Sequence, residues 1–241
     1  LFIDRDGTMI AEPPVDLQVD SLEKLEFLPY AISSLKKLQD YGYELVMVSN
    51  QDGRGTSSFP EEDFQKPHQK MLRILANEGI EFAEIFIDDS FPEDNSPNRK
   101  PNTGLLTNYL ISNLIDLHNS YTIGDRETDV QLAVNLGCKA IFFSDRNLGN
   151  TALNSNSWPE ICKFLTAKKD RLVELERNTK ETKIRLSLNL DGKGEHKIDT
   201  GLKFYDHMLD QLAKHSGVDL SLKVEGDLEI DEHHTIEDSA I

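Results

Sequence analysis

Over its first two thirds the chain alternates short apolar runs with longer segments of helical period, and this alternation restricts the folds open to it. Continuous apolar strands between amphipathic helices are typical of a parallel sheet covered on both faces, so we predict an α/β fold. Strands are expected at residues 1–3, 45–48, 84–87, 121–123 and 140–143. Helices are expected at residues 31–41, 61–78, 103–117, 128–136 and 158–165.

The pattern changes after about residue 166. "NLGNTALNSNSW" is predicted to be a loop, and the charged "TAKKDRLVELERNTKET" a connecting segment. "TKIRLSLNL" and "VDLSLKVEGD" alternate with period two as half-buried strands do, and "HKIDTG" is expected to return as a hairpin partner of the former. "LKFYDHMLDQLAKHSG" has a helical period. We therefore predict two domains, residues 1–166 and an α+β domain at 167–241.

The balance of charge limits the partners. The 241 residues carry 26 Lys and Arg against 43 Asp and Glu, a formal charge of −17. Nucleic acid and anionic membrane surfaces both favour basic patches, so neither is expected as a partner. No apolar run reaches the ~18 residues needed to span a bilayer. The two cysteines form no CxxC pair, which favours reduced thiols and a cytoplasmic location.

Polar residues follow the ends of three predicted strands. Asp4 and Asp6 follow the first strand, Ser49 and Asn50 end the second, and Asp125 follows "YTIG". Ligands of open parallel sheets bind outside the carboxyl ends of the strands. Taken alone, Asp-x-Asp is more often a solvated turn. We therefore look for further groups that would make this edge a site.

Later residues supply those groups. Lys100 stands in "NRKP", and Ser49 and Asn50 offer hydrogen-bond donors for a phosphoryl group. Carboxylate oxygens suit Mg²⁺, and a carboxylate can attack phosphorus covalently. A calcium-binding EF-hand loop starting at Asp4 is excluded, because its sixth position is Met9 and its twelfth is Val15.

The segments "DRDGT", "VSNQDG", "RKP" and "GDRETD" resemble, in order, the four motifs of haloacid-dehalogenase-type phosphatases. The resemblance covers residues 1–166 and implies a Rossmannoid parallel sheet. "FIDRDGT", "EPP" and "SNQDGRGT" resemble more closely the histidinol-phosphate phosphatases, which act on L-histidinol phosphate.

This resemblance implies a role for each motif residue. Asp4 would be the nucleophile that forms an aspartyl-phosphate, and Asp6 would protonate the leaving alkoxide and then activate water. Mg²⁺ would be held by the Asp4 carboxylate, the Asp6 backbone carbonyl and Asp125, with Asp129 beside them. The phosphate oxygens would be held by Ser49, Asn50 and Lys100.

One stretch departs from the family pattern. Members usually carry a zinc loop of Cys and His before "RKP", whereas "IDDSFPEDNSPNRKP" contains neither. The corresponding positions are Asp88, Ser90, Ser96 and Asn98, which do not form a tetrahedral nitrogen and sulfur site. We predict no structural zinc, a loop held by Asp, Asn and Ser turns, and a role for this loop at the substrate entrance.

A second candidate site lies in "DLEIDEHHTIEDSAI". His233 and His234 would point about 100° apart on a helix, and Glu237 shares a face with both. The spacing does not fit HExxH. On residue type alone, surface histidines at a polar helix start, and a core-packed His207, are the more common readings.

"RNTKET", "TGLKFYDHMLDQLAKH" and "EGDLEIDEHHTIEDSA" resemble the imidazoleglycerol-phosphate dehydratases. The resemblance implies Mn²⁺ ligands at His207, His233, His234 and Glu237, and a substrate-proximal Glu181. Members have two halves, each with HHxxE, and only one is present here. We therefore expect residues 167–241 to be a truncated dehydratase domain, unable to dehydrate imidazoleglycerol phosphate.

The combined interpretation is a bifunctional enzyme of histidine biosynthesis, expected to be a homo-oligomer at full length. One alternative is a phosphatase of another small alcohol or sugar phosphate. Another is a non-catalytic metal-binding or assembly fragment.

Overall fold

The computed structural model describes residues 1–112, 114–167 and 171–240, and the chain divides into two compact units, 1–167 and 168–241. The predicted boundary between residues 166 and 167 adjoins 168–170, which lie outside the described residues.

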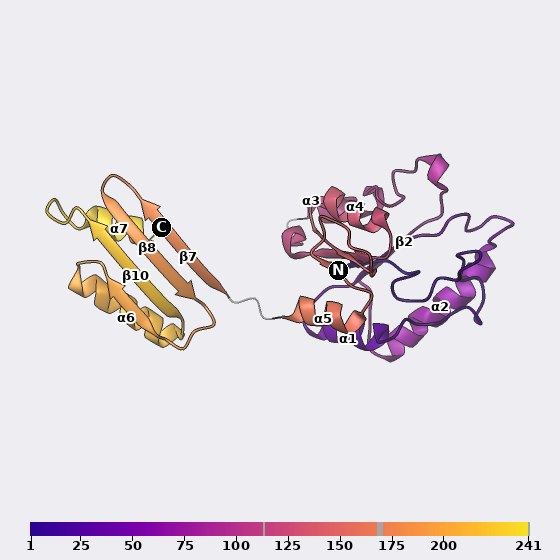
Figure 1. The fold of residues 1–241 in the computed structure, drawn as a ribbon, viewed down its shortest axis with the longest axis horizontal. Coiled ribbons are helices and arrows are strands. Elements are labelled where there is room, and N and C mark those ends of the chain that lie inside the picture. Colours follow the sequence, from indigo (N-terminus) through magenta and orange to yellow (C-terminus); the bar gives the residue numbers. More distant parts are fainter. Residues whose placement is uncertain (113, 168–170, 241) are drawn as a thin grey trace. The chain divides into compact units, whose positions relative to one another are not determined.

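The first unit is built on a six-stranded sheet in which neighbouring strands pair in parallel (Figure 1). The order is β3-β2-β1-β4-β5-β6. The strands are β1 (Phe2–Ile3), β2 (Val46–Asn50), β3 (Glu84–Asp88), β4 (Tyr121–Gly124), β5 (Lys139–Phe142) and β6 (Leu153–Asn154). The chain runs outward from β1 to β3 and then restarts on the other side at β4, which creates a switch point between β1 and β4, where ligands of such sheets bind.

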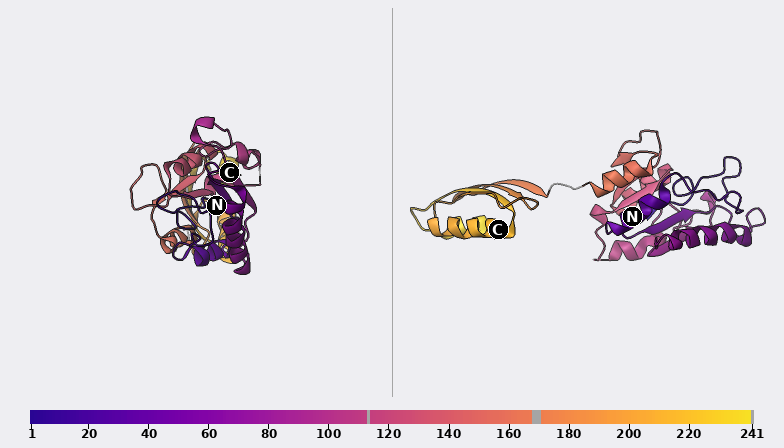
Figure 2. Two further views of the ribbon diagram at one scale, coloured as in Figure 1. Left: turned by 90° about the vertical axis from the view of Figure 1, so that its right-hand side faces the viewer. Right: turned by 90° about the horizontal axis from the view of Figure 1, so that it is seen from below.

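Helices cover both faces of this sheet, as predicted (Figures 1 and 2). They are α1 (Ala31–Asp40), α2 (Glu61–Asn77), α3 (Thr107–Ile111), α4 (Glu127–Leu136) and α5 (Trp158–Thr166). Strand side chains alternate between the faces, so Leu1 and Ile3 pack in one core cluster with α1, α2 and α5. Phe2, Val46 and Val48 pack in the other with α3 and α4.

Two predictions for the first unit are wrong. The helix expected at 103–117 is a 3₁₀ turn (Gly104–Leu106), the short α3 and a second 3₁₀ turn (Leu117–Asn119); Asn113 lies outside the described residues. Ser112 leaves the helical region with ψ of 127°, and its hydroxyl accepts from the Leu114 N–H, a local bond that competes with the helix. The loop expected at 147–158 contains β6, which pairs with β5.

The second unit is a four-stranded sheet of order β7-β8-β10-β9, with two helices. Its elements are β7 (Leu172–Asn178), β8 (Thr182–Asn189), β9 (His196–Asp199), α6 (Lys203–Ser216), β10 (Asp219–Gly226) and α7 (His233–Ala240). Ile184, Leu222 and Val224 are buried with Ala213 of α6, which covers one face of the sheet (Figure 2). The opposite side of α6 leaves Phe204, Met208 and Leu212 exposed.

The pairing of this sheet differs from the prediction at both edges. The segment predicted as a connection contains β7, which pairs antiparallel with β8. Its Leu and Val side chains are exposed, so burial imposes no alternating pattern on its sequence. β9 pairs parallel with β10, not with β8. The Asp219 carboxylate accepts from the Lys193 and Glu195 N–H groups and so holds the preceding turn beside the start of β10.

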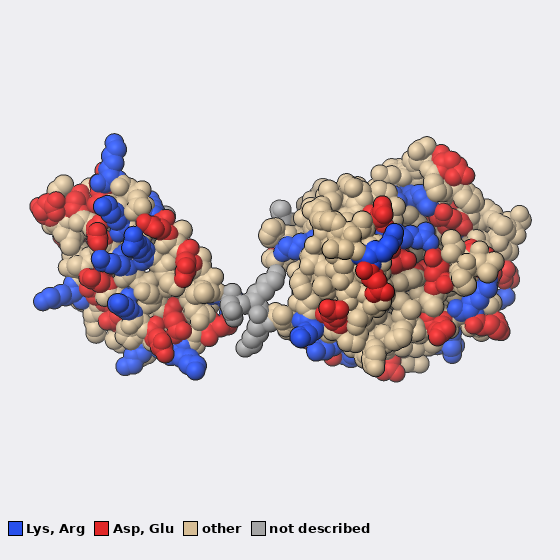
Figure 3. Space-filling view, in the orientation of Figure 1, with Lys and Arg blue, Asp and Glu red and all other residues tan. Residues whose placement is uncertain are grey.

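Acidic and basic side chains are interspersed on the visible face of each unit, with no broad basic patch there (Figure 3). Within the described residues, none of the helices combines the length and apolar character needed to cross a membrane. Cys138 and Cys162 are both free thiols.

Trp158 ties α5 to the turn after β1. Its fully buried indole Nε1–H donates to the Thr8 carbonyl at 2.8 Å. We expect Trp158→Phe to lower the unfolding free energy of the first unit by about 2 kcal/mol, because it removes packed volume and leaves a buried carbonyl without its donor. Urea unfolding followed by circular dichroism measures this, since Trp158 is the single tryptophan. The exposed Tyr41→Phe is the control, and an equal change in both variants would contradict the expectation.

Candidate active site

The turn after β1 places Asp4 and Asp6 at the carboxyl edge of the sheet. The Asp4 N–H donates to the Ile123 carbonyl of β4 at 2.9 Å and so extends the sheet pairing beyond the strand. Gly7 follows with φ of 69°, a left-handed conformation that strains residues with a side chain. The chain turns back there and leaves the carboxylates 7% and 8% exposed. Both predicted carboxylates therefore lie at the switch point.

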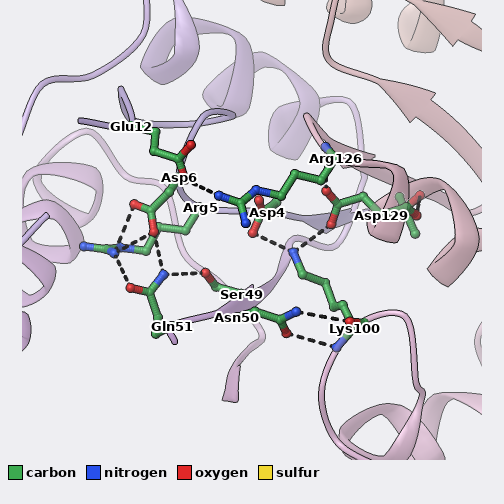
Figure 4. A network of polar contacts seen from close by, with 11 residues as sticks. Asp4, Arg5, Asp6, Glu12, Ser49, Asn50, Gln51, Lys100, Arg126 and Asp129 are labelled. Atoms are coloured by element: carbon green, nitrogen blue, oxygen red, sulfur yellow. Dashed lines mark hydrogen bonds and ion pairs between the residues drawn. The ribbon is translucent and has the colours of Figure 1, made fainter. Parts of the chain in front are cut away.

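Lys100 links this turn to α4. Its Nζ donates to Asp4 Oδ1 at 2.6 Å and to Asp129 Oδ1 at 2.7 Å (Figure 4). Burial acts to lower the pKa of this lysine, but the Asp129 and Asp4 carboxylates outweigh it and raise the pKa above its usual value. The Asn50 side chain accepts from the Lys100 N–H at 3.0 Å and donates to its carbonyl at 3.1 Å. Asn50 therefore holds the Lys100 backbone with its amide oxygen and one amide hydrogen.

Three carboxylates converge beside Lys100. Asp4, Asp125 and Asp129 each offer an oxygen within 4.8 Å of the others. Burial, followed by the charges of Asp4 and Asp129, raises the pKa of Asp125 to about 7. Asp125 Oδ1 is buried without a hydrogen-bond partner. A cluster of anionic oxygens with an unsatisfied member fits a hard divalent cation such as Mg²⁺.

Two glycines allow this close approach. A Cβ added at Gly7 would lie 2.6 Å from Asp125 Cγ. A Cβ added at Gly124 would lie 2.5 Å from Asp129 Cβ. Real Cβ atoms do not come so near, so glycine is required at both positions for the carboxylates to meet.

Ser49 and Asp6 are joined through Gln51, a residue that the sequence analysis did not single out. Gln51 Nε2 donates to Asp6 Oδ2 at 2.5 Å and to Ser49 Oγ at 2.8 Å. Its Oε1 accepts from Arg5 Nη1 at 3.2 Å, and the same nitrogen lies 3.1 Å from both Asp6 oxygens. Burial raises the pKa of Asp6, while Arg5 and Gln51 act in the opposite direction. Arg5 and Gln51 both lie inside the motifs quoted above, but their residue types did not predict this hydrogen-bond network.

A cavity of about 140 Å³ opens above these groups. Its wall includes Asp4, Asp6, Ser49, Asn50 and Lys100, together with Glu12, Asp16, Asp52, Phe59 and Arg126. Arg126 forms an ion pair with Glu12 across its mouth. The wall carries five acidic side chains and two basic ones, and three of the acidic ones, Glu12, Asp16 and Asp52, are ion-paired with basic side chains.

The loop before Lys100 is organised around the buried Asp88 carboxylate. Asp88 Oδ1 accepts from both the N–H and the hydroxyl of Ser90, and Oδ2 accepts from the Ser96 hydroxyl at 3.0 Å. The Asn98 N–H donates to Ser96 Oγ at 3.2 Å. Hydrogen bonds thus join the four positions that correspond to the family's zinc ligands, and they involve Asp and Ser side chains, as predicted for this loop. The absence of zinc from the protein stays a prediction.

Arg99 attaches the same loop to the cavity wall. It binds the Asp52 carboxylate with two nitrogens, at 2.5 and 3.0 Å, and donates to the Ser90 carbonyl at 2.5 Å.

The candidate metal ligands of the second unit are less closely gathered. His233 Nε2 lies 3.0 Å from Glu237 Oε2, and His234 Nδ1 lies 3.1 Å from Asp227 Oδ2. The bond to Asp227 raises the pKa of His234, with a smaller contribution from the charge of Glu181. Among the described residues of this unit, no three His, Cys, Asp or Glu side chains meet as the three aspartates do. His207 lies on α6, away from any such group.

The parallel sheet, its order and the acid cluster at the switch point define a haloacid-dehalogenase-like phosphatase. The sequence profile of the polynucleotide kinase 3 phosphatase family matches residues 1–141, and that of imidazoleglycerol-phosphate dehydratase matches 200–241. The chain belongs to the family of the histidine biosynthesis bifunctional protein HisB. It is 55% identical to the Spirosoma linguale member and 54% identical to the Bacteroides fragilis member, over its whole length and 67% of theirs.

Solved structures agree on the fold. The D,D-heptose 1,7-bisphosphate phosphatase of B. bronchiseptica, complexed with magnesium and phosphate, aligns with a TM-score of 0.60 at 24% identity. The alignment covers 68% of this chain and 96% of that one. A HAD-like phosphatase from Mesorhizobium loti aligns with a TM-score of 0.56 at 22% identity, over 70% and 87% of the two chains. The protein is thus a histidine-biosynthesis enzyme with a phosphatase fold.

Proposed function

We propose that residues 1–166 form a Mg²⁺-dependent phosphatase that hydrolyses L-histidinol phosphate through a phosphoryl group on Asp4. The observation that carries the proposal is Lys100 lying between Asp4 and Asp129, beside the unpartnered oxygen of Asp125. A carboxylate held next to a buried cation can receive a phosphoryl group, because the cation offsets the negative charge on the phosphoryl oxygens.

In the first half of the reaction, an Asp4 oxygen attacks phosphorus and the bond from phosphorus to the histidinol oxygen breaks. Asp6, two residues on, gives its proton to that leaving oxygen, so L-histidinol departs as the neutral alcohol. Ser49 and Lys100 supply donors for the phosphoryl oxygens while they carry the displaced charge.

In the second half, Asp6 is a carboxylate and takes a proton from water as the water oxygen attacks phosphorus. The bond from phosphorus to Asp4 breaks, which restores the Asp4 carboxylate and the Asp6 acid and releases inorganic phosphate. No other acid or base is needed to balance the protons.

Mg²⁺ would be held by Asp4, Asp125 and the Asp6 backbone carbonyl. When bound, it would polarise the phosphoryl oxygens and offset the charge of the carboxylates. The unsatisfied Asp125 oxygen and the raised pKa of that residue both support a cation at this place.

L-Histidinol phosphate is favoured as the substrate by the family relationship, because the relatives that are 55% and 54% identical to this chain are histidine biosynthesis proteins. The charge of the cavity wall does not add to this preference. Glu12, Asp16 and Asp52 lie on the wall beyond the reacting carboxylates, but they are ion-paired with Arg126, Lys24 and Arg99. A different small alcohol or sugar phosphate is the second candidate, because the Asp88-centred loop before Lys100 replaces the family's zinc loop.

Phosphate release from L-histidinol phosphate, glycerol 3-phosphate and a hexose phosphate tests both candidates. We expect the histidinol ester to have the highest kcat/KM, and EDTA to lower its turnover at least about 100-fold, with recovery on adding Mg²⁺. Mg²⁺ should also raise the melting temperature, and Asp125→Asn should remove that shift.

A zinc-selective chelator is the matched control and should leave turnover unchanged. Loss of activity under it would contradict the expected absence of zinc. A higher kcat/KM for the phosphate esters of uncharged alcohols would favour the second candidate and point to the loop as the cause.

We further propose that residues 167–241 are the N-terminal part of an imidazoleglycerol-phosphate dehydratase domain. The dehydratase profile match at 200–241 and the pairing of His233 with Glu237 support this. His207, His233, His234 and Glu237 would be Mn²⁺ ligands, with Glu181 near the substrate imidazoleglycerol phosphate and with homo-oligomers formed by the longer family members.

A further inference from the structure

We propose that Gln51, backed by Arg5, is the positioning residue that aims the Asp6 carboxyl at the leaving oxygen and turns the Ser49 hydroxyl toward the phosphate. The proposal rests on the phosphatase function above and assigns a task to two residues that contact neither the phosphate nor a metal in that scheme. Figure 4 shows Gln51 between Asp6 and Ser49.

The orientation of the Gln51 amide follows from its neighbours. Both Nε2 hydrogens have acceptors, the Asp6 carboxylate at 2.5 Å and the Ser49 oxygen at 2.8 Å. Its Oε1 faces the Arg5 guanidinium at 3.2 Å, a group that can only donate. A flipped amide would set its nitrogen against the Arg5 guanidinium, which has no acceptor for it. One orientation alone therefore satisfies all three contacts.

The orientation of the Gln51 amide decides whether the Ser49 hydroxyl acts toward it as a donor or as an acceptor. A hydroxyl that accepts a hydrogen bond from Gln51 keeps its own hydrogen for a different acceptor. Ser49 lies at the end of β2 on the cavity wall, where a phosphoryl oxygen is that acceptor in the proposed reaction. The same amide thus prepares the phosphate donor and holds the acid.

Arg5 fixes the far side of Asp6. Its side chain is 0% exposed, and its guanidinium lies 5.0 Å from the centre of the Phe64 ring. Nε and Nη2 are buried without a hydrogen-bond partner, so most of its donor capacity is unused. An apolar side chain would fill such a place at lower cost, because a buried cation loses its hydration. A role in holding Asp6 and Gln51 explains why a positively charged side chain, Arg5, occupies this buried position.

The network is anchored in the sheet. The Gln51 backbone N–H donates to the Asp88 carbonyl at the end of β3 at 2.7 Å, and Arg5 directly follows Asp4. Gln51 is 4% exposed, so its side chain has little room to move. A group held on rigid elements in this way is preorganised for the reaction.

The test compares leaving groups. An alkoxide needs a proton from Asp6 as it leaves, whereas p-nitrophenolate does not. We expect Gln51→Met to lower kcat/KM for L-histidinol phosphate about 100-fold and for p-nitrophenyl phosphate by less than about 10-fold, so that their ratio falls about tenfold or more. Arg5→Met should shift the ratio in the same direction.

The ratio is measured within one preparation, so a fraction of unfolded protein cancels from it. Gln131→Met is the matched control, because that exposed amide donates to Asn135 on α4, away from the cavity lining, and its ratio should equal the wild-type value. A Gln51→Met protein that loses both activities equally, while Asp6→Asn shifts the ratio, would overturn the positioning role. An Asp6→Asn protein with the wild-type ratio would instead overturn the proposed acid, and the positioning role with it.

Discussion

Asp4→Asn is expected to lower phosphate release from L-histidinol phosphate by at least about 10⁴-fold while leaving the fold intact. The amide is isosteric but cannot form the acyl phosphate, and loss of a nucleophile is among the largest single effects known for enzymes. Stability should change by less than about 1 kcal/mol, because Lys100 keeps Asp129 as a partner and one charge leaves a crowded acidic cluster.

Phosphate release, urea unfolding and intact mass should be recorded on the same preparation. Intact mass detects deamidation, which would restore the carboxylate and mimic residual activity. Asp40→Asn on the exposed side of α1 is the control and should retain wild-type turnover. Mg²⁺-dependent turnover within tenfold of wild type in undeamidated Asp4→Asn would exclude a covalent role for Asp4.

Lys100→Met should damage both activity and stability. Removing the cation leaves the Asp4 and Asp129 carboxylates buried and facing each other, which we expect to lower the unfolding free energy of the first unit by about 3 kcal/mol in EDTA. kcat/KM should fall about 10³-fold, because the phosphoryl group also loses its buried cation.

The stability loss should depend on pH in a defined direction. A buried carboxyl with a raised pKa destabilises the fold while it is ionised, so the penalty is complete above that pKa and shrinks as the pH falls from it toward the ordinary carboxyl pKa. The Lys100 charge acts to lower the pKa of Asp129 in the wild type, so its removal raises that pKa further. The difference between Lys100→Met and wild type should therefore be larger at pH 8 than at pH 5.

Lys66→Met, on the exposed surface of α2, is the matched control and should stay within about 0.5 kcal/mol of wild type at both pH values. A Lys100→Met protein as stable as this control at pH 8 would mean that the acidic cluster does not need the lysine to remain folded.

The first unit could be predicted in outline because its signals are local. The central strands are mostly apolar, because both of their faces are buried. The polar residues that end β1, β2 and β4 then fall at one edge by topology, which brought Asp4, Ser49 and Asp125 to the candidate site. The helix expected at 103–117 failed because the Ser112 hydroxyl satisfies the backbone locally, a choice that helical period does not reveal.

The edge strands, in contrast, could not be predicted from local sequence signals. β6 has two residues and pairs only with β5, and β7 has exposed side chains, so neither carries a burial pattern. β9 takes its place through the Asp219 carboxylate, 20 or more residues away along the chain. Pairing of this kind depends on partners that lie far apart in the sequence.

The amino-acid sequence by itself determined the α/β class and the order of the motifs from which the reacting groups are proposed, because apolar runs and motif residues are local properties of the chain. Tertiary structure alone decided that Gln51 joins Asp6 to Ser49, that Arg5 is buried behind them, and that Asp88 organises the loop before Lys100. The physical reason is that hydrogen-bond polarity and desolvation depend on which groups surround a side chain once the chain has folded.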